Sequence, residues 1–314
     1  MHQPAGVSGE STTEHAPHLM APTGEQLNLW HIAGDTIPLP AYRGKSSQTP
    51  RLKLSVLMAA YNEESTITRA IDKVLNADCP CEIELIVVND GSTDATPALL
   101  TRVDDPRVKV HHHAANQGKG AALLAAASLA TGTYVLPFDA DLEYSAEDIS
   151  RLLEPVLNGR SEVVYGVRVF GCNTVYRTYI YALGNRLLTR TANILFNAHL
   201  TDLHTCLKLI PLVMLRSFNL REKGFGLDSE ITAVILRAGI RPFEVPVSYY
   251  GRSRAEGKKI TWRDALACVW ILCRVRVWRR SYHTSAGQPE EQLEEYDRPD
   301  AQADTPPAMA SLSM

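Results

Sequence analysis

The feature that most constrains this chain is the alternation, between residues 54 and 250, of apolar runs of strand length with longer amphipathic segments. This pattern is typical of a mostly parallel sheet that is covered by helices. The expected strands are Leu54–Ala60, Ile83–Asn89, Val108–His112, Tyr134–Phe138 and Val163–Val169. The expected fold class is therefore α/β, with a mostly parallel mixed sheet.

Helices are expected between and after these strands. Gln117–Ala130 is rich in alanine, and Gly132 is expected to end it. Ser145 and Asp148 have the spacing of a capping box that opens a helix at Ala146–Leu157. Two further helices are expected at Thr178–Phe196 and Asp228–Arg237. An edge strand that contains two prolines is expected at Arg241–Tyr250.

Composition divides the chain of 314 residues into four parts. Residues 1–50 are rich in Pro, Gly, Ser and Thr and predict a flexible leader. Residues 51–260 contain the alternating pattern and form the expected domain. Residues 261–280 predict a basic amphipathic helix. Residues 281–314, which hold seven acidic residues against one arginine, predict an acidic disordered tail.

Positive charge is concentrated in residues 251–280, which hold nine Lys or Arg against two acidic residues. Such a stretch favours an anionic partner. Between residues 262 and 280, tryptophans and aliphatic side chains fall near one helical face and arginines surround it. This arrangement predicts a helix that lies in the headgroup plane of an anionic membrane. A helix packed against the core is the alternative.

The protein is expected to be peripheral, on the cytoplasmic (inner) face of a membrane. The longest uninterrupted apolar run, Leu266–Cys273, is too short to cross a bilayer. Nothing that resembles a secretory signal opens the sequence. The six cysteines are scattered without the spacing of a zinc site, which indicates reduced thiols.

Polar residues gather after three of the expected strands. The segments are Tyr61–Glu64, Asn89–Asp94 and Asp139–Glu143. In open α/β sheets, ligands bind beyond the carboxyl ends of the strands. Chemistry is therefore expected at these three strand ends.

Asp139 and Asp141 directly follow a strand and are separated by one residue. Two hard oxygen ligands beside a diphosphate form a site for Mg²⁺ or Mn²⁺. An isolated Asp-x-Asp is also common in solvated turns, but its place at a strand end favours the metal. Glu143 either adds a third oxygen or belongs to the start of a helix.

Asp90 is placed to accept hydrogen bonds from a base or a ribose, and a helix cap at Ser92 is the alternative interpretation. Gly118 and Gly120 allow close approach of the backbone to a ligand. Lys119, between them, is placed to meet phosphate or sugar oxygens.

Four segments in this order resemble the family 2 inverting glycosyltransferases of GT-A fold, and within that family the polyprenol (dolichol) phosphate mannosyltransferases and the bacterial polyprenyl-phosphate hexosyltransferases. They are Leu54–Glu64, Ile86–Asp94, Asn116–Gly120 and Phe138–Asp141. The resemblance covers residues 52–260 and makes residues 51–260 the glycosyltransferase domain. The nucleotide-sugar pocket that it implies is lined by Ala59, Tyr61, Glu63, Asp90, Lys119, Asp139 and Ala140.

The resemblance also implies that Asp139 and Asp141 hold the metal, with Glu143 as the added oxygen. Ala59 and Ala60 stand where the dolichol enzymes often have Pro and Thr, which leaves the donor open between GDP-mannose and UDP-glucose.

The second half of the chain predicts the acceptor side. Thr201–Lys208 resembles the acceptor signature of the polyprenyl-phosphate enzymes, and Arg252–Lys259 resembles the loop that closes over their substrate. The planar fork of arginine suits phosphate oxygens, although surface charge is the alternative for Arg177 and also for Arg168. The candidates for the acceptor phosphate are Arg168, Arg177, Lys208 and Lys259. The expected catalytic residues are Asp139, Asp141, Arg168 and Arg254.

The expected reaction is metal-dependent, inverting transfer of mannose or glucose to a polyprenyl phosphate, which yields a lipid-linked sugar donor. A phosphomonoester has a second pKa of about 6, so its oxygen is a nucleophile at neutral pH without a general base. The expected partners are a nucleotide sugar, a polyprenyl phosphate and an anionic membrane surface, and no nucleic acid.

Two alternatives stay open. One is transfer to a hydroxyl acceptor such as a growing glycan, with Asp228 or Glu230 as base. The other is a non-catalytic protein that binds nucleotide sugars or acts as a scaffold.

Overall fold

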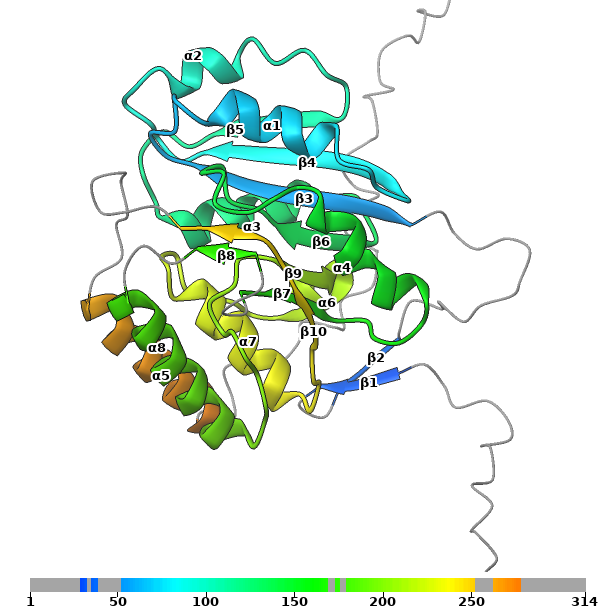
Figure 1. The fold of residues 1–314 in the computed structure, drawn as a ribbon, viewed down its shortest axis with the longest axis vertical. Coiled ribbons are helices and arrows are strands. Elements are labelled where there is room, and N and C mark those ends of the chain that lie inside the picture. The colour runs from blue at the N-terminus through cyan, green and yellow to red at the C-terminus, as the bar shows by residue number, and fades with distance from the viewer. Residues whose placement is uncertain are drawn as a thin grey trace, which may run out of the picture.

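The computed structural model describes residues 29–32, 35–38, 52–168, 173–175, 179–251 and 262–277. Its centre is a seven-stranded sheet with the strand order β10-β7-β9-β6-β3-β4-β5 (Figure 1). In chain order these strands are β3 (Lys53–Ala60), β4 (Glu82–Asn89), β5 (Val108–His112), β6 (Tyr134–Pro137), β7 (Val164–Val167), β9 (Lys208–Pro211) and β10 (Phe243–Pro246). Only β9 runs antiparallel to its neighbours, so the sheet is mostly parallel, as the sequence predicts.

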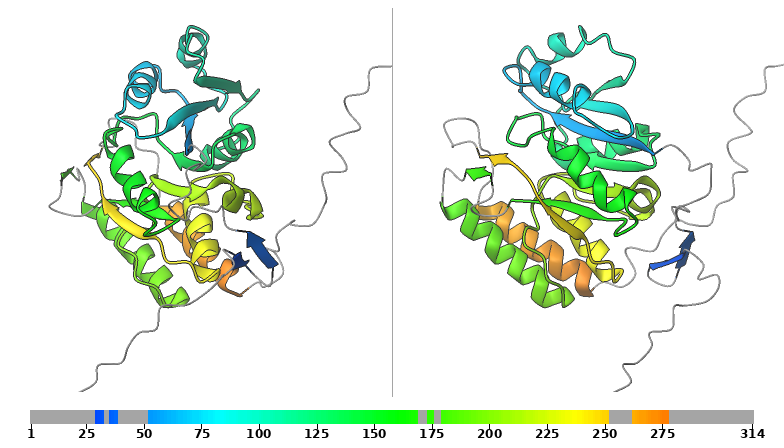
Figure 2. Two further views of the ribbon diagram at one scale, coloured as in Figure 1. Left: turned by 90° about the vertical axis from the view of Figure 1, so that its right-hand side faces the viewer. Right: turned by 45° about the vertical axis from the view of Figure 1, so that its right-hand side comes forward.

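Helices cover both faces of the sheet (Figures 1 and 2). They are α1 (Ile67–Leu75), α2 (Thr96–Leu100), α3 (Lys119–Leu129), α4 (Asp148–Leu157), α5 (Tyr179–Phe196), α6 (Leu212–Ser217), α7 (Leu227–Arg237) and α8 (Trp262–Val277). The core on one face includes residues of α1, α2 and α4, and the core on the other includes residues of α3, α5, α6, α7 and α8.

The central strand β3 supplies both cores because its side chains alternate between the two faces. Val56 and Met58 enter one core and Leu57 enters the other, and all three are fully buried. Burial of one such side chain stabilises the fold by about 1.5–3 kcal/mol. Burial on both faces explains why the strand reads as a nearly continuous apolar run in the sequence.

The predicted elements lie close to the observed ones. Each strand or helix bound named from sequence differs from the observed bound by at most two residues, with two exceptions. They are the segment 241–250 and the carboxyl end of the helix predicted at 261–280, of which the structure describes residues up to Val277. The segment 241–250 divides into the edge strand β10 and the short strand β11 (Tyr249–Tyr250), which pairs with β8 (Thr174–Val175) in a separate two-stranded sheet. The predicted edge position is therefore confirmed for β10.

The predicted capping box at the start of α4 is wrong. Glu147 occupies the N-cap position, and no side chain caps the helix. Asp148 is buried and accepts a hydrogen bond from the backbone N–H of Ser248 at 2.7 Å, and it also pairs with Arg151 at 3.0 Å. A tertiary contact across the fold therefore replaces the local cap.

Strand β9 and helix α6 were not predicted. β9 lies antiparallel between β6 and β7, so its first residue lies at the edge of the sheet where the parallel strands end. This position brings Cys206, two residues before Lys208, close to Asp139 in the polar segment that follows β6.

The leader and the tail are described only in small part. Strands β1 (Leu29–Ile32) and β2 (Asp35–Pro38) pair antiparallel within residues 1–50, where the sequence predicts a flexible leader. The acidic tail at 281–314 lies outside the described residues. Among the described residues, no helix combines the length and the apolar character that a bilayer crossing requires.

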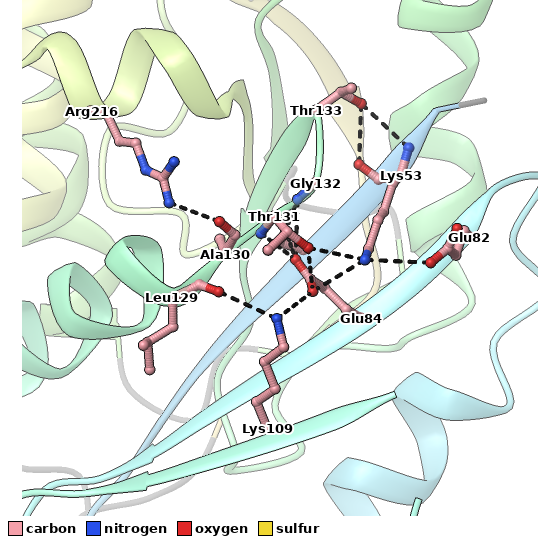
Figure 3. A network of polar contacts seen from close by, with 11 residues as sticks. Lys53, Glu82, Glu84, Lys109, Leu129, Ala130, Thr131, Gly132, Thr133 and Arg216 are labelled. Carbon is pink, nitrogen blue, oxygen red and sulfur yellow. Dashed lines mark hydrogen bonds and ion pairs between the residues drawn. The ribbon is translucent and has the colours of Figure 1, made fainter. Parts of the chain in front are cut away.

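A buried carboxylate joins the amino ends of the sheet strands (Figure 3). Glu84 accepts hydrogen bonds from Ser55 Oγ at 2.6 Å and from the backbone and hydroxyl of Thr131 at 2.6 and 2.8 Å. Lys109 Nζ lies 3.1 Å from Glu84 Oε2, and Lys53 Nζ lies 3.4 Å from it. Burial opposes the charge, but these partners outweigh burial and lower the pKa of Glu84 to about 2.

Because the folded pKa of Glu84 lies below its ordinary value of 4.5, this carboxylate stabilises the fold above that pH and loses its effect as the pH falls toward about 2. The shift corresponds to roughly 3 kcal/mol, of which about 2 kcal/mol disappears between pH 5 and pH 3. We expect the difference in unfolding free energy between wild type and Glu84→Gln to shrink by that amount over this range in urea titrations. For Glu82→Gln, at an exposed position of the same strand, the difference in unfolding free energy from wild type should stay constant between pH 5 and pH 3. An equal change in the two variants would contradict the lowered pKa of Glu84.

Candidate active site

The predicted site residues meet at one edge of the sheet. Tyr61 follows β3, Asp90 follows β4, Asp139 lies just beyond β6 and Arg168 follows β7. Lys208 opens the antiparallel β9 at this same edge. The carboxyl ends of the parallel strands therefore collect acidic and basic side chains, as the sequence predicts.

The turns after β3 and β4 are locked together. Asn62 adopts a positive φ of 55° and its Oδ1 accepts the N–H of Thr93 at 2.8 Å, while Ser92 Oγ accepts the N–H of Asn62 at 3.0 Å. Glu63 N–H donates to Thr96 Oγ1 at 3.0 Å. These bonds set the path of the chain around Tyr61 and Glu63.

Asp90 organises the loop before α3. Its Oδ1 accepts the N–H of Gln117 at 2.9 Å and its Oδ2 accepts the N–H of Gly118 at 2.8 Å, and His113 Nδ1 lies 2.8 Å from Oδ1. Ser92 caps no helix, because α2 begins only at Thr96, so the cap interpretation is wrong. The contact of Asp90 with a base or ribose stays a prediction.

Two glycines let this loop pack against residues 222–224. Gly118 has a φ of +103°, and a Cβ there would lie 2.4 Å from the carbonyl oxygen of Lys223. A Cβ on Gly120 would lie 2.5 Å from the carbonyl oxygen of Glu222. Ala121 N–H donates to Lys223 O at 3.0 Å. Only glycine fits at these positions, and their close packing fixes Lys119 between them.

Lys119 reaches from this loop to the segment after β6. Its Nζ lies 2.6 Å from Asp139 Oδ1, and both side chains are about a fifth exposed. Burial opposes the charge of Lys119, but Asp139 outweighs it and raises the pKa of the ammonium well above its ordinary value. A fixed cation and a fixed carboxylate thus lie side by side, open to a ligand.

The acidic turn itself is well ordered. Asp141 Oδ1 accepts the N–H of Glu143 at 3.0 Å, and Leu142 has a φ of 63°. Ala140 is buried. Glu143 Oε2 accepts the hydroxyl of Tyr249 at 2.6 Å. Within the described part of the chain, no three His, Cys, Asp or Glu side chains are arranged to hold a metal, so the predicted set of three carboxylates is not preassembled.

On the acceptor side, Arg168 forms a bidentate ion pair that the sequence alone did not predict. Its Nε and Nη2 lie 2.6 and 2.8 Å from the two oxygens of Asp202, which also accepts Asn185 Nδ2 at 2.7 Å. The guanidinium lies 5.0 Å from the centre of the Tyr249 ring. Burial opposes the charge of Asp202, but Arg168 outweighs it and lowers the pKa of Asp202 to about 2. The predicted Thr201–Lys208 signature contained Asp202 but gave it no role.

Two tyrosines connect the acidic turn after β6 with Arg168. The rings of Tyr144 and Tyr249 lie 5.2 Å apart, and Tyr144 OH accepts the backbone N–H of Cys206 at 3.2 Å. Tyr249 contacts Glu143 through its hydroxyl and Arg168 through its ring face. The acidic turn and the buried arginine are therefore parts of one packed unit.

Lys208 is fully buried rather than open to an acceptor. Its Nζ lies 2.7 Å from Asp228 Oδ1, also donates to the carbonyl of Thr205, and lies 5.4 Å from the centre of the Tyr165 ring. Burial acts to raise the pKa of Asp228, but Lys208 outweighs it and lowers that pKa. The structure thus gives Lys208 an internal partner, which contradicts a direct contact with an acceptor phosphate in this arrangement.

Glu230, the other candidate base, is also fully buried. It accepts the N–H groups of Arg221 and Glu222 at 2.8 and 2.9 Å and pairs with Arg274 at 2.9 Å. Its contacts are those of a structural carboxylate. Three other predicted residues, Arg177, Arg254 and Lys259, lie outside the described residues.

Comparisons with known proteins agree with this architecture. The chain matches the family model Glycosyl transferase family 2 over residues 55–216, just over half of its length. The low-salt glycan biosynthesis hexosyltransferase Agl6 of Haloferax volcanii is 29% identical over 248 residues, which are 76% of this chain and 56% of Agl6. The chain thus spans just over half the length of that relative.

The polyprenol monophosphomannose synthase of Mycolicibacterium smegmatis is 30% identical over 234 residues, which are 69% of this chain and 85% of the synthase. Among solved structures, glucosyl-3-phosphoglycerate synthase from Mycobacterium tuberculosis in complex with Mn²⁺, UDP and glucosyl-3-phosphoglycerate gives a TM-score of 0.53 at 19% identity. The match covers 77% of this chain and 88% of that one. At this identity the likeness concerns the fold.

The mixed sheet, with its polar turns at the carboxyl edge, has the GT-A-type fold of that solved structure. The chain belongs to glycosyl transferase family 2 and is a glycosyltransferase.

The packing of Gly118 against Lys223 predicts a large cost for a methyl group there. Gly118→Ala should lower the free energy of unfolding by roughly 3 kcal/mol or more, because its backbone conformation is nearly exclusive to glycine and the Cβ meets a carbonyl. Gly159→Ala is the matched control, since Gly159 also has a positive φ but has open space around it, and it should cost about 1 kcal/mol. Equal costs in urea titrations would show that the close approach is not required.

Proposed function

We propose that this enzyme transfers a hexose, mannose or glucose, from a nucleotide sugar to a polyprenyl phosphate with inversion, giving a lipid-linked sugar donor. One observation carries the proposal. Tyr249 bonds the acidic turn at Glu143 with its hydroxyl and lies under the buried Arg168 with its ring. A carboxylate turn suited to a donor diphosphate and an arginine suited to an acceptor phosphate are therefore adjacent.

The donor is GDP-mannose or UDP-glucose in this proposal. Residues along the carboxyl edge line its pocket; they are Ala59, Tyr61, Glu63, Asp90, Lys119, Asp139 and Ala140. The similarity to a polyprenol monophosphomannose synthase supports mannose, and the fold shared with a UDP-binding glucosyl enzyme supports glucose.

Asp139 and Asp141 would hold a divalent cation. The fit rests on the pair that Asp139 already makes with the Lys119 ammonium, which shows that this carboxylate is presented to a cation at the surface of the site. Two carboxylate oxygens together with diphosphate oxygens suit Mg²⁺ or Mn²⁺. When bound, the metal neutralises charge on the departing nucleoside diphosphate.

The side chains of this protein then orient the two anionic substrates. Lys119 presents positive charge to the donor diphosphate, and Arg168, held by Asp202, presents it to the acceptor phosphate. The acceptor oxygen is already ionised near neutral pH, so no general base is needed. Lys208 neutralises Asp228, so the acceptor phosphate does not meet an unpaired carboxylate. Arg177, Arg254 and Lys259 are the further cations proposed for the acceptor.

The metal assignment predicts that Asp139→Asn and Asp141→Asn each lower divalent-dependent turnover by at least about a hundredfold, because a charge-stabilising contact to the leaving group is worth roughly 3 kcal/mol. The assay is sugar transfer in Mn²⁺ or Mg²⁺. Asp72→Asn, at an exposed position of α1, is the control and should retain activity. Full turnover in either site variant would refute the metal site.

The acceptor is tested with purified protein, a panel of GDP- and UDP-sugars, and undecaprenyl or dolichyl phosphate, with and without Mn²⁺. We expect a lipid-linked hexose and no transfer to free sugars or glycans. Transfer to a glycan hydroxyl, with a pH profile that Asp228→Asn abolishes, would establish the hydroxyl alternative instead. Donor binding without any transfer would establish a non-catalytic protein.

We further propose that α5 and α8 rest on an anionic membrane surface. The two helices pack against each other and lie side by side (Figures 1 and 2). Each carries a row of apolar side chains, more than half exposed, at helical spacing. The rows are Ile180, Leu187 and Ile194 on α5, and Leu266, Trp270 and Val277 on α8. Exposed arginines on the same helices suit anionic headgroups.

This docking surface predicts that Leu187→Glu and Trp270→Glu each reduce binding to vesicles containing phosphatidylglycerol by at least about fivefold, since each places a charge against acyl chains. Cosedimentation measures the bound fraction. Val213→Glu replaces an equally exposed apolar residue on α6 and should bind as wild type does. Undiminished binding of both helix variants would exclude this surface.

A further inference from the structure

We propose that Arg274, on α8, is a positioning residue for the loop that carries Lys119, and that it acts through residues 221–224. This inference deepens the proposed function, since it names what holds the donor-side cation in place. Four consecutive sets of contacts support it.

The first contacts are ion pairs of Arg274. Its Nη2 lies 2.8 Å from Glu222 Oε1 and 2.9 Å from Glu230 Oε1, and the side chain is largely buried. Arg274 therefore connects α8 both to the segment at 221–224 and to the first turn of α7.

The second contacts make the connection between α8 and residues 221–224 sensitive to loss of the positive charge of Arg274. Glu230 is fully buried, and its Oε2 accepts the N–H groups of Arg221 and Glu222 at 2.8 and 2.9 Å. Removing one partner of a buried ion pair leaves an uncompensated charge in the interior. Without Arg274, Glu230 is expected to turn toward water or to take up a proton, and either change weakens its hold on the backbone of Glu222.

The third contacts pass from this segment to the donor-side loop. Lys223 O accepts the N–H of Ala121, the amide two residues after Lys119, at 3.0 Å. The missing side chains of Gly118 and Gly120 let the two backbones touch on either side of that residue. A shift of residues 222–224 therefore shifts the start of α3.

The fourth contact is the pair of Lys119 with Asp139 at 2.6 Å. An ion pair at this distance depends on the relative positions of the start of α3 and the turn after β6. Arg274 thus influences the cation at the donor site without touching the donor.

Arg216 provides a matched control, because it holds the opposite end of α3. It donates to the carbonyls of Ala127, Ser128 and Ala130 at 2.7–3.0 Å. Loss of the Arg216 side chain removes about as many arginine contacts as loss of the Arg274 side chain, so it also lowers stability. It leaves the contacts at Lys119 in place. If Arg274 only stabilised the fold, loss of either arginine would affect the exchange of residues 118–123 and the binding of nucleotide alike.

The first test is hydrogen exchange followed by mass spectrometry on the full chain, without substrates. In Arg274→Ala, amides in peptides covering 118–123 and 221–226 should exchange about tenfold faster than in wild type, whereas Arg216→Ala should accelerate 127–131 instead. Arg274→Lys should restore most of the protection because it keeps the charge. Glu222→Gln, which removes only one of the two ion pairs, should give an intermediate effect and covers the case in which Arg274→Ala does not fold.

The second test is binding of UDP and GDP with Mn²⁺, measured by calorimetry. Arg274→Ala should lower the affinity for the nucleotide that wild type prefers by at least about fivefold. Arg216→Ala should lower this affinity by less than about twofold. A lower melting temperature in Arg274→Ala, with wild-type exchange at 118–123, would overturn the inference. If wild type bound neither nucleotide, the proposed function would fail, whereas the exchange experiment would still decide the role of Arg274.

Discussion

The side of the site that we propose for the donor is organised around the ion pair between Lys119 and Asp139. Lys119 is delivered by a loop that Asp90 holds through two backbone amides and that two glycines press against residues 222–224. Asp139 is delivered by the end of β6, which is fixed in the sheet between β3 and β9. Because both partners are anchored by backbone contacts, charge at the site is arranged before a ligand arrives. Such preorganisation is what makes electrostatic stabilisation of a leaving group effective.

The side of the site that we propose for the acceptor is built on a different principle. Arg168 and Asp202 form a buried pair, whose desolvation cost is offset only by good geometry and by additional hydrogen bonds from partners such as Asn185. The bidentate geometry fixes the plane of the guanidinium, and Tyr249 supports one face of it. Since the same tyrosine bonds Glu143, a change in the acidic turn is transmitted to the arginine. The acidic turn and Arg168 are thus connected through a single side chain.

The sequence predicted the positions of the polar turns well because their signals are local. Each polar turn directly follows an apolar run, so the positions of Asp90 and Asp139 at strand ends follow from the order of residues. The acceptor side depends on pairings that the sequence does not encode locally. Asp202 meets Arg168 only because β9 enters antiparallel between β6 and β7, and that same entry buries Lys208 against Asp228. Asp148 was misread as a cap for the same reason, since its partner Ser248 comes from the far end of the domain.

Helix α8 confirms the packing alternative in part, whereas its contact with a membrane surface stays a proposal. Ile271, Leu272 and Val275 enter the core, which is the packing alternative, while Leu266, Trp270 and Val277 face outward. A helix with apolar side chains on two faces reads as amphipathic only weakly, although Arg263 and Arg276 are also exposed on it. The arginine between these faces, Arg274, is drawn inward by Glu222 and Glu230 rather than left on the surface. The exposed row Leu266, Trp270 and Val277 on α8 is therefore apolar. Arg274 instead pairs inward with Glu222, whose neighbour Lys223 contacts the start of α3 next to Lys119.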